Sequence, residues 1–365
     1  MIPPRKTWLI HMGQFITAWG GPMLFASPVV LSATWFPGEQ QTLAISVGVT
    51  AGAVGQAVSF IIGPVFVPDS GSCQQNRSGH NISDIVTEHI QTISLENKNH
   101  NCSGDAAFIK DAGDGITKLL LVEFIWSVLL LLVTMLYFPA RPPTPPSISA
   151  SFEREDYLRG FLRALKSPKV YLIGFIYALP AAVFSMWANF IDVFLLPIGI
   201  QQDDAGWIGF WGIFSAGISC IIVGGFIDHF KAWLKSSILV LYCISIGSAV
   251  WFLLLCMKII PFSLGMVYAS FILTSAMMNS PQALMFELIC QVCYPIGEAT
   301  ASGILCIIFN FVAIIFLILA SIEILGTAWL NWSLLVSVGV CVPPLALVSV
   351  NFKRLEVDKH GDKSE

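Results

Sequence analysis

Long apolar blocks separated by short polar connections repeat along the whole chain. A helix needs about 20 mostly apolar residues to cross a bilayer, and nine blocks approach or exceed that length. The predicted spans are 8–36, 43–67, 119–139, 171–198, 206–227, 236–258, 262–289, 297–322 and 326–350. Because lipid offers the backbone no hydrogen bonds, runs of this length predict a bundle of transmembrane helices.

The composition of the chain agrees with this pattern. Hydrophobic residues make up 55% of the 365 residues and charged residues only 12%, and the mean hydropathy is +0.75. A soluble domain carries about 25% charged residues, so this chain has too few to cover a water-soluble globule. We therefore predict an all-α polytopic membrane protein whose main partner is the lipid bilayer. The net charge of −4 gives no reason to expect nucleic acid binding.

The polar segment 68–118 is predicted to face the lumen or the outside. It contains three glycosylation sequons, at Asn76, Asn81 and Asn101. A sequon marks a loop exposed in the secretory compartments, and three in one loop strengthen that interpretation. Cys73 and Cys102 lie in the same loop. An oxidising lumen allows a disulfide between them, although two free thiols fit the sequence equally well.

The second long connection, residues 140–169, is predicted to be cytosolic. It begins with a proline-rich stretch and continues into residues 152–166, where apolar positions recur at helical spacing beside four basic residues. This pattern is typical of a basic amphipathic helix on a membrane surface. Positive charge gathers on the cytosolic side of membrane proteins, and the charged tail 351–365 falls on the same side.

Three predicted spans precede this linker and six follow it. The plan resembles the major facilitator superfamily, in which two six-helix halves are joined by a cytosolic loop, with the first three helices lacking. The expected parts are residues 1–139, a partial N-terminal half; 140–169, the linker; 170–350, a six-helix C-terminal half; and 351–365, the tail. A nine-span protein of a different design is the alternative.

A motif after the fifth predicted span supports this resemblance. Its members are Gly224, Asp228, Lys231 and Lys235. They resemble the loop between the eighth and ninth helices of facilitators, where the aspartate caps a helix end and pairs with cations. The resemblance implies a gate that holds one conformation closed.

Several stretches resemble solute carrier family 49. They include Leu31-Ser-Ala-Thr-Trp-Phe36, Tyr137-Phe-Pro-Ala-Arg-Pro-Pro-Thr-Pro-Pro146, Asp204-Ala-Gly-Trp-Ile-Gly-Phe-Trp211 and Val292-Cys-Tyr-Pro295. The resemblance implies a proton-coupled symporter that exports pyridoxine from the lysosome to the cytosol. A choline, ethanolamine or haem carrier of the same family is the alternative substrate assignment.

The resemblance also leaves two questions of context open. The N-terminal segment that carries a lysosomal sorting signal in the family is not found, so the plasma membrane is the alternative location. Without three helices that line half of the transport cavity, a non-transporting isoform that partners the full-length carrier is the alternative function.

Intramembrane carboxylates are the first candidates for proton transfer, because an ionisable group in lipid costs on the order of 2.5–3.5 kcal/mol. Asp192 and Glu287 are the two that we retain. Pro281 interrupts the helix before Glu287 and frees backbone carbonyls, so Asn279 and Gln282 are expected to face a cavity.

A pyridine-type ring suits stacking on aromatic faces, and its hydroxyl groups suit amide partners. The further substrate candidates are Phe184, Trp187, Asn189, Gln56 and Asn310. Asn310 is included because choline-transporting relatives carry a binding glutamine near this position. The sequence has no Cys/His cluster with metal spacing, no phosphate loop and no nucleophile motif, so we expect neither a metal, nor a cofactor, nor enzymatic activity.

Overall fold

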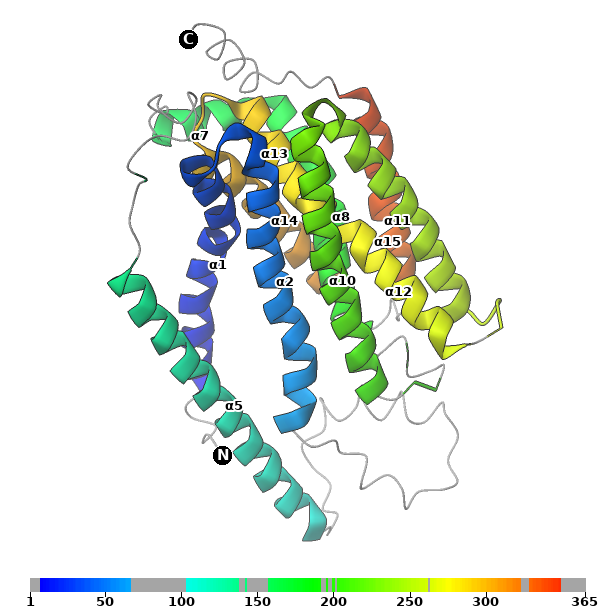
Figure 1. The fold of residues 1–365 in the computed structure, drawn as a ribbon. Coiled ribbons are helices and arrows are strands. Elements are labelled where there is room, and N and C mark those ends of the chain that lie inside the picture. The colour runs from blue at the N-terminus through cyan, green and yellow to red at the C-terminus, as the bar shows by residue number, and fades with distance from the viewer. Residues whose placement is uncertain are drawn as a thin grey trace, which may run out of the picture. The chain divides into compact units, whose positions relative to one another are not determined.

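The computed structural model describes residues 7–66, 103–137, 142, 157–191, 195, 199–200, 202–261, 263–322 and 328–348. These residues fold into helices and short connections (Figure 1). Eight helices among them are long and apolar enough to cross a membrane. The prediction of an all-helical, multi-pass membrane protein is therefore confirmed.

The helices fall into two groups along the chain. Those before the linker are α1 (Thr7–Trp35), the 3-10 helix η2 (Gly38–Gln40), α2 (Gln41–Phe66) and α5 (Ser103–Leu136). Those after it are α7 (Tyr157–Leu165), α8 (Pro168–Ala188), α10 (Gln202–His229), the 3-10 helix η4 (Lys231–Trp233), α11 (Leu234–Cys256), α12 (Leu264–Asn279), α13 (Pro281–Cys293), α14 (Glu298–Ala320) and α15 (Ala328–Leu347). Contacts divide the chain into two compact units, one containing α5 and the end of α2 from Ile61, the other containing the remaining described helices.

The predicted span 262–289 forms two helices rather than one. α12 ends at Asn279, Ser280 joins the two helices, and α13 begins at Pro281. Proline has no N–H to donate and its ring clashes with the preceding turn, so it starts a helix more readily than it continues one. α13 then runs to Cys293, four residues beyond the predicted end.

The helices after the linker surround an aromatic core. Trp187 of α8 is 1% exposed and packs edge-on against Phe252 of α11, with ring centroids 5.4 Å apart. It also stacks on Phe271 of α12 at 5.9 Å. Rings in such offset or edge arrangements attract one another beyond their buried area, so three helices are held together at this point.

α1 packs against α14 and leaves most of its own surface outside this core. Phe25 of α1 meets Phe309 of α14 at a centroid distance of 5.8 Å. On the other side of α1, large apolar side chains such as Trp19 and Met23 are exposed. Outward apolar side chains are expected where a helix faces lipid rather than water.

α7 lies across one end of this unit, beside the start of α14 (Figure 1). We call this end, which contains η2, η4, α7 and the α13–α14 connection, the linker end. Small residues form the inner face of α7: Gly160 is so close to Ile296 that an added Cβ would lie 3.2 Å from its Cγ2. Leu158 and Leu162 are exposed on the outer face, together with Arg159. Part of the predicted segment 152–166 is thus a helix, from Tyr157 to Leu165.

Asn331 provides a first testable prediction, because its side-chain oxygen accepts the indole N–H of Trp187 at 2.9 Å. Replacing Asn331 with leucine removes this acceptor from a buried donor, which costs about 1–3 kcal/mol of unfolding free energy. We expect a lower melting temperature for the purified protein in detergent. The drop should shrink when Trp187 is already phenylalanine.

Asn189→Leu is the matched control, because Asn189 is exposed and bonds only within its own helix turn, to the Ser185 carbonyl. Equal drops for the leucine variants at Asn331 and Asn189 would contradict a specific role of the Trp187–Asn331 bond.

Candidate functional site

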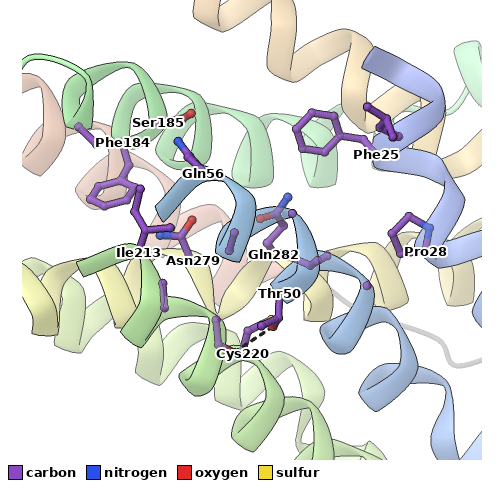
Figure 2. A pocket seen from close by; sticks show the side chains of 18 residues that line it. Phe25, Pro28, Thr50, Gln56, Phe184, Ser185, Ile213, Cys220, Asn279 and Gln282 are labelled. Atoms are coloured by element: carbon purple, nitrogen blue, oxygen red, sulfur yellow. Dashed lines mark hydrogen bonds between the residues drawn. The ribbon is translucent and has the colours of Figure 1, made fainter. Parts of the chain in front are cut away.

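A cavity of about 300 Å³ lies within the larger unit (Figure 2). It is bounded by α1, α2, α8, α10 and the junction of α12 with α13. Its lining residues are Leu24, Phe25, Pro28, Gly48, Val49, Thr50, Gly52, Ala53, Gln56, Phe184, Ser185, Ala188, Ile213, Ala216, Gly217, Cys220, Asn279 and Gln282. Helices from both sides of the linker therefore contribute to one cavity.

The cavity lining is mainly apolar, with a few hydrogen-bonding groups. Phe25 and Phe184 supply aromatic rings, and Gln56, Asn279 and Gln282 supply side-chain amides (Figure 2). None of the described residues that line it is charged. A small number of polar groups in an apolar surround is the usual composition of a small-molecule site.

The helix break positions two of these amides. Asn279 is the last residue of α12 and Gln282 is the second residue of α13, so both reach the cavity from the junction. The amide NH₂ of Asn279 donates to the Ser275 carbonyl at 2.9 Å. Its side-chain oxygen and its second amide N–H are therefore the groups that Asn279 can offer to a ligand.

α2 and α10 approach closely at the cavity wall and on toward the linker end, because α10 has glycines where the two helices meet. The Thr50 hydroxyl donates to the Gly217 carbonyl at 3.0 Å, and a Cβ at Gly217 would lie 2.7 Å from Thr50 Cγ2. At Gly224 an added Cβ would lie 2.9 Å from Ser46 Cβ and 3.1 Å from the Thr42 carbonyl oxygen. Only glycine permits this spacing of the two backbones.

At the linker end, Asp228 joins α10 to the first turn of α2. The backbone N–H of Thr42 donates to Asp228 Oδ1 at 3.1 Å and that of Leu43 to Oδ2 at 2.7 Å. Lys231 Nζ lies 2.8 Å from Oδ1 and donates to the Thr42 hydroxyl at 3.2 Å. We call these four residues the Asp228 cluster. The carboxylate satisfies N–H groups that a helix start leaves unbonded, and it meets the positive end of the helix dipole.

Of the other two residues of the predicted gate motif, Gly224 lies next to this cluster and Lys235 lies apart from it. Gly224 is buried one turn before Asp228, where it faces Ser46. Lys235 instead donates to the Ala346 carbonyl at 2.8 Å and to the Val348 carbonyl. Lys235 therefore caps the end of α15, whereas Asp228 and Lys231 connect to α2.

The structure places some of the remaining predicted site residues in the cavity and others elsewhere. Phe184, Gln56, Asn279 and Gln282 line the cavity. Trp187 lies in the aromatic core, Asn189 is exposed, and the Asn310 amide donates to the Cys306 carbonyl at 2.8 Å. Glu287 is buried in α13, where its Oε1 accepts from the Gln291 amide at 2.7 Å. None of these last four is among the residues that line the cavity.

Several predicted residues lie outside the part of the chain that the structure describes. They are Asp192, the sequon residues Asn76, Asn81 and Asn101, and the two loop cysteines, Cys73 and Cys102. Their proposed roles in proton transfer, glycosylation and disulfide formation remain predictions.

Sequence reasoning missed Phe25, Thr50 and Ser185 as cavity residues. The sequence does contain a signal for Thr50, because positions 50, 53 and 56 share one face of α2 and Gln56 was already a candidate. Phe25 gives no such signal, since 26 phenylalanines occur in the chain and most of the apolar blocks contain one or more of them.

The comparisons with known proteins assign the chain to a family. No family model matches the chain. It is 30% identical over 353 residues to a solute carrier family 49 member 4 homolog of Xenopus laevis, an alignment that spans 96% of this chain and 72% of that protein. The chain belongs to solute carrier family 49. Its relatives are transporters, so this family-49 chain is a membrane transporter and not an enzyme.

More distant relatives and solved structures agree with that family. The human choline/ethanolamine transporter FLVCR2 is 23% identical, over 95% of this chain and 60% of its own length. The crystal structure of the major facilitator superfamily transporter FucP in the outward conformation aligns with a TM-score of 0.58, at 10% identity, over 89% of this chain and 72% of FucP. The likeness to FucP shows that this chain has the fold of that transporter.

Proposed function

We propose that this chain carries a small polar ring compound, pyridoxine in the first instance, by proton-coupled symport from the lysosome to the cytosol. The observation that supports a small ring substrate is the cavity, in which two phenylalanine rings and three amide side chains meet. Aromatic faces stack on a pyridine ring, and amides exchange hydrogen bonds with its hydroxyl groups. The choice of pyridoxine as the substrate and of the proton as the coupling ion comes from the family resemblance.

The size of the cavity supports a small substrate over a large one. Small-molecule sites range from roughly 300 to 1,000 Å³, and this cavity of about 300 Å³ lies at the lower end. A one-ring metabolite suits that volume, whereas a tetrapyrrole such as haem requires a much larger space. We therefore do not retain haem as a substrate.

The Asp228 cluster supports an alternating-access cycle. It ties α2 to α10 at one end of the cavity-forming unit, so α2 and α10 can separate there only when its bonds break. We assign the linker end to the cytosol, because the exposed basic residues Arg159, Arg163 and Lys166 gather there. Opening of the Asp228 cluster would then release substrate into the cytosol.

Choline or ethanolamine is the second candidate substrate. FLVCR2 is named as a choline/ethanolamine transporter, and the ring faces of Phe25 and Phe184 can attract a quaternary ammonium group. The amides of Gln56 and Gln282 can bind the hydroxyl of either compound. The choice between the two substrates is made by direct competition.

The location and the assembly are further parts of the proposal. We propose the lysosomal membrane, with the plasma membrane as the alternative, and glycans on the loop 68–118. Association with a full-length carrier of the same family is the competing role, in which this chain would modulate transport rather than perform it.

Uptake of labelled pyridoxine tests the proposal. Cells that display the chain at their surface are assayed at pH 5.5 and 7.5, with unlabelled choline or ethanolamine as competitors. Acid-stimulated uptake that choline does not inhibit supports pyridoxine symport, and inhibition by choline favours the second candidate. If a surface-delivered chain transports neither compound, the proposed function is wrong.

Gln56→Leu tests the cavity itself. The substitution keeps the size of the side chain but removes its hydrogen bonds to substrate, a loss of about 1–1.5 kcal/mol that corresponds to roughly tenfold weaker binding. We expect the KM for uptake to rise by about tenfold with little change in surface expression. Gln14→Leu is the matched control, because Gln14 lies on α1 about 15 Å along the helix from the lining residue Leu24. Equal KM values for the two variants would remove Gln56 from the site.

A further inference from the structure

Glu287 is a buried carboxylate that is only partly hydrogen-bonded. Its side chain is 1% exposed. Oε1 accepts from the Gln291 amide one helical turn later, at 2.7 Å, whereas Oε2 has no hydrogen-bond partner. Buried carboxylates are rare and are normally paired with a cation or fully hydrogen-bonded, so the environment of Glu287 requires an explanation.

The helices around α13 do not supply an ion-pair partner to Glu287 within the described ranges. The helices that pack against α13 are α8, α10, α11, α12 and α14. The charged residues and the histidine on these five helices are Lys169, Asp203, Asp204, Asp228, His229, Lys235 and Glu298. The tyrosines and cysteines on the five helices and on α13 are Tyr171, Tyr177, Cys220, Tyr242, Cys243, Cys256, Tyr268, Cys290, Cys293 and Cys306. Of the nearby charges, Asp228 is bonded to α2 and Lys231, and Lys235 is bonded to the end of α15.

The charge state of Glu287 decides how costly its burial is. An ionised carboxylate with one oxygen unbonded would be a buried charge without a counter-ion, which is far more unfavourable than a neutral carboxylic acid in the same place. In the conformation described here, a proton on Glu287 would remove this buried charge. An ionised Glu287 would need water at α13, which requires the surrounding helices to separate.

We propose that Glu287 is the residue that binds and releases the coupled proton. In the hydrated state open to the acidic side, the carboxylate takes a proton from hydronium to form the neutral acid and water. In the closed state this acid is buried, and when the other side opens it gives the proton back to water. Glu287 lies five residues after the cavity residue Gln282, about 7.5 Å along the same helix. Substrate contact and proton binding are therefore carried by one rigid segment that begins at Pro281. This inference rests on the proposed transport function.

Transport measurements on Glu287→Gln test the coupling role. Glutamine keeps the shape of the side chain and imitates the neutral acid. We expect the ratio of pyridoxine uptake at pH 5.5 to that at pH 7.5 to fall to about one. Exchange of labelled for unlabelled pyridoxine, which needs no net proton movement, should remain within about twofold of the unsubstituted chain. Glu39→Gln is the control, because Glu39 is an exposed carboxylate at the linker end. The control variant should keep the pH dependence of uptake.

An infrared spectrum of the purified protein tests protonation without any substrate. At pH 7.5 the unsubstituted chain should show a carbonyl-stretching band of a neutral carboxylic acid, and Glu287→Gln should lack it. Absence of a Glu287-dependent band overturns the proton site, as does a glutamine variant that keeps the pH dependence of uptake. A clear band in a chain that transports neither pyridoxine nor choline supports the proton site and overturns only the proposed function.

Discussion

Asp228→Ala is expected to reduce the initial rate of substrate uptake by roughly tenfold or more. The carboxylate binds two backbone N–H groups of α2 and the ammonium group of Lys231. Only 4% of its side chain is exposed, so water does not replace these bonds in the closed state. A hydrogen bond to a charged group contributes about 1.5–3 kcal/mol, and each 1.4 kcal/mol changes an equilibrium by about tenfold. The closed conformation should therefore be depopulated.

Uptake normalised to the amount of surface protein is the measurement for Asp228→Ala. Asp204→Asn is the matched control, because Asp204 is an exposed carboxylate near the other end of the same helix. The control should retain most of the uptake. If Asp228→Ala transports at more than half the unsubstituted rate, the Asp228 cluster does not govern the cycle.

Gly224→Val is expected to lower both the melting temperature and the uptake rate. The new side chain would meet Ser46 Cβ and the backbone carbonyl of Thr42, at 2.9 and 3.1 Å from its Cβ. A backbone oxygen cannot rotate away, so α10 must move from α2 and carry Asp228 with it. Overpacking of this kind costs about 1–3 kcal/mol, in addition to the distorted bonds of the Asp228 cluster.

Gly247→Val separates this steric effect from the general cost of replacing a helical glycine. A Cβ at Gly247 of α11 meets nothing within 4 Å, so this variant should melt within a few degrees of the unsubstituted chain. A combination of the milder Gly224→Ala with Ser46→Gly should recover part of the loss, because the side chain that collides is removed. If Gly224→Val and Gly247→Val behave alike, close contact of α2 and α10 is not needed.

The positions of the helices could be predicted because every span in lipid must satisfy its backbone hydrogen bonds within itself. Eight of the nine predicted blocks overlap one of the eight long helices, since a run of about 20 apolar residues has few other stable forms in a bilayer. The exception, 262–289, is informative. Pro281 was expected to interrupt the hydrogen bonding inside one span. Whether a proline only disturbs a helix or ends it depends on the packing around it, which the sequence does not display.

The site was harder to predict because the rotation of each helix about its own axis decides which of its residues line the cavity. Gln282 and Asn279 were identified, since polar side chains beside a proline break have few other environments in a span. Trp187 was expected in the same place and lies instead in the aromatic core. One aromatic residue suits a cavity as well as a core, and only the azimuth of α8 distinguishes the two. Asn331, the partner that fixes this orientation, is 144 residues away.

The length of α5 offers a practical route to the orientation of the chain in its membrane. Its 34 residues extend about 51 Å at 1.5 Å per residue, whereas a bilayer with its headgroups is about 40–45 Å thick. Its apolar stretch begins only at Gly113, so the first ten residues form a helical stalk outside the hydrocarbon. A short epitope placed on this stalk would be reached by an antibody from one side of the membrane only. Staining of intact and permeabilised cells would then show which compartment the stalk faces.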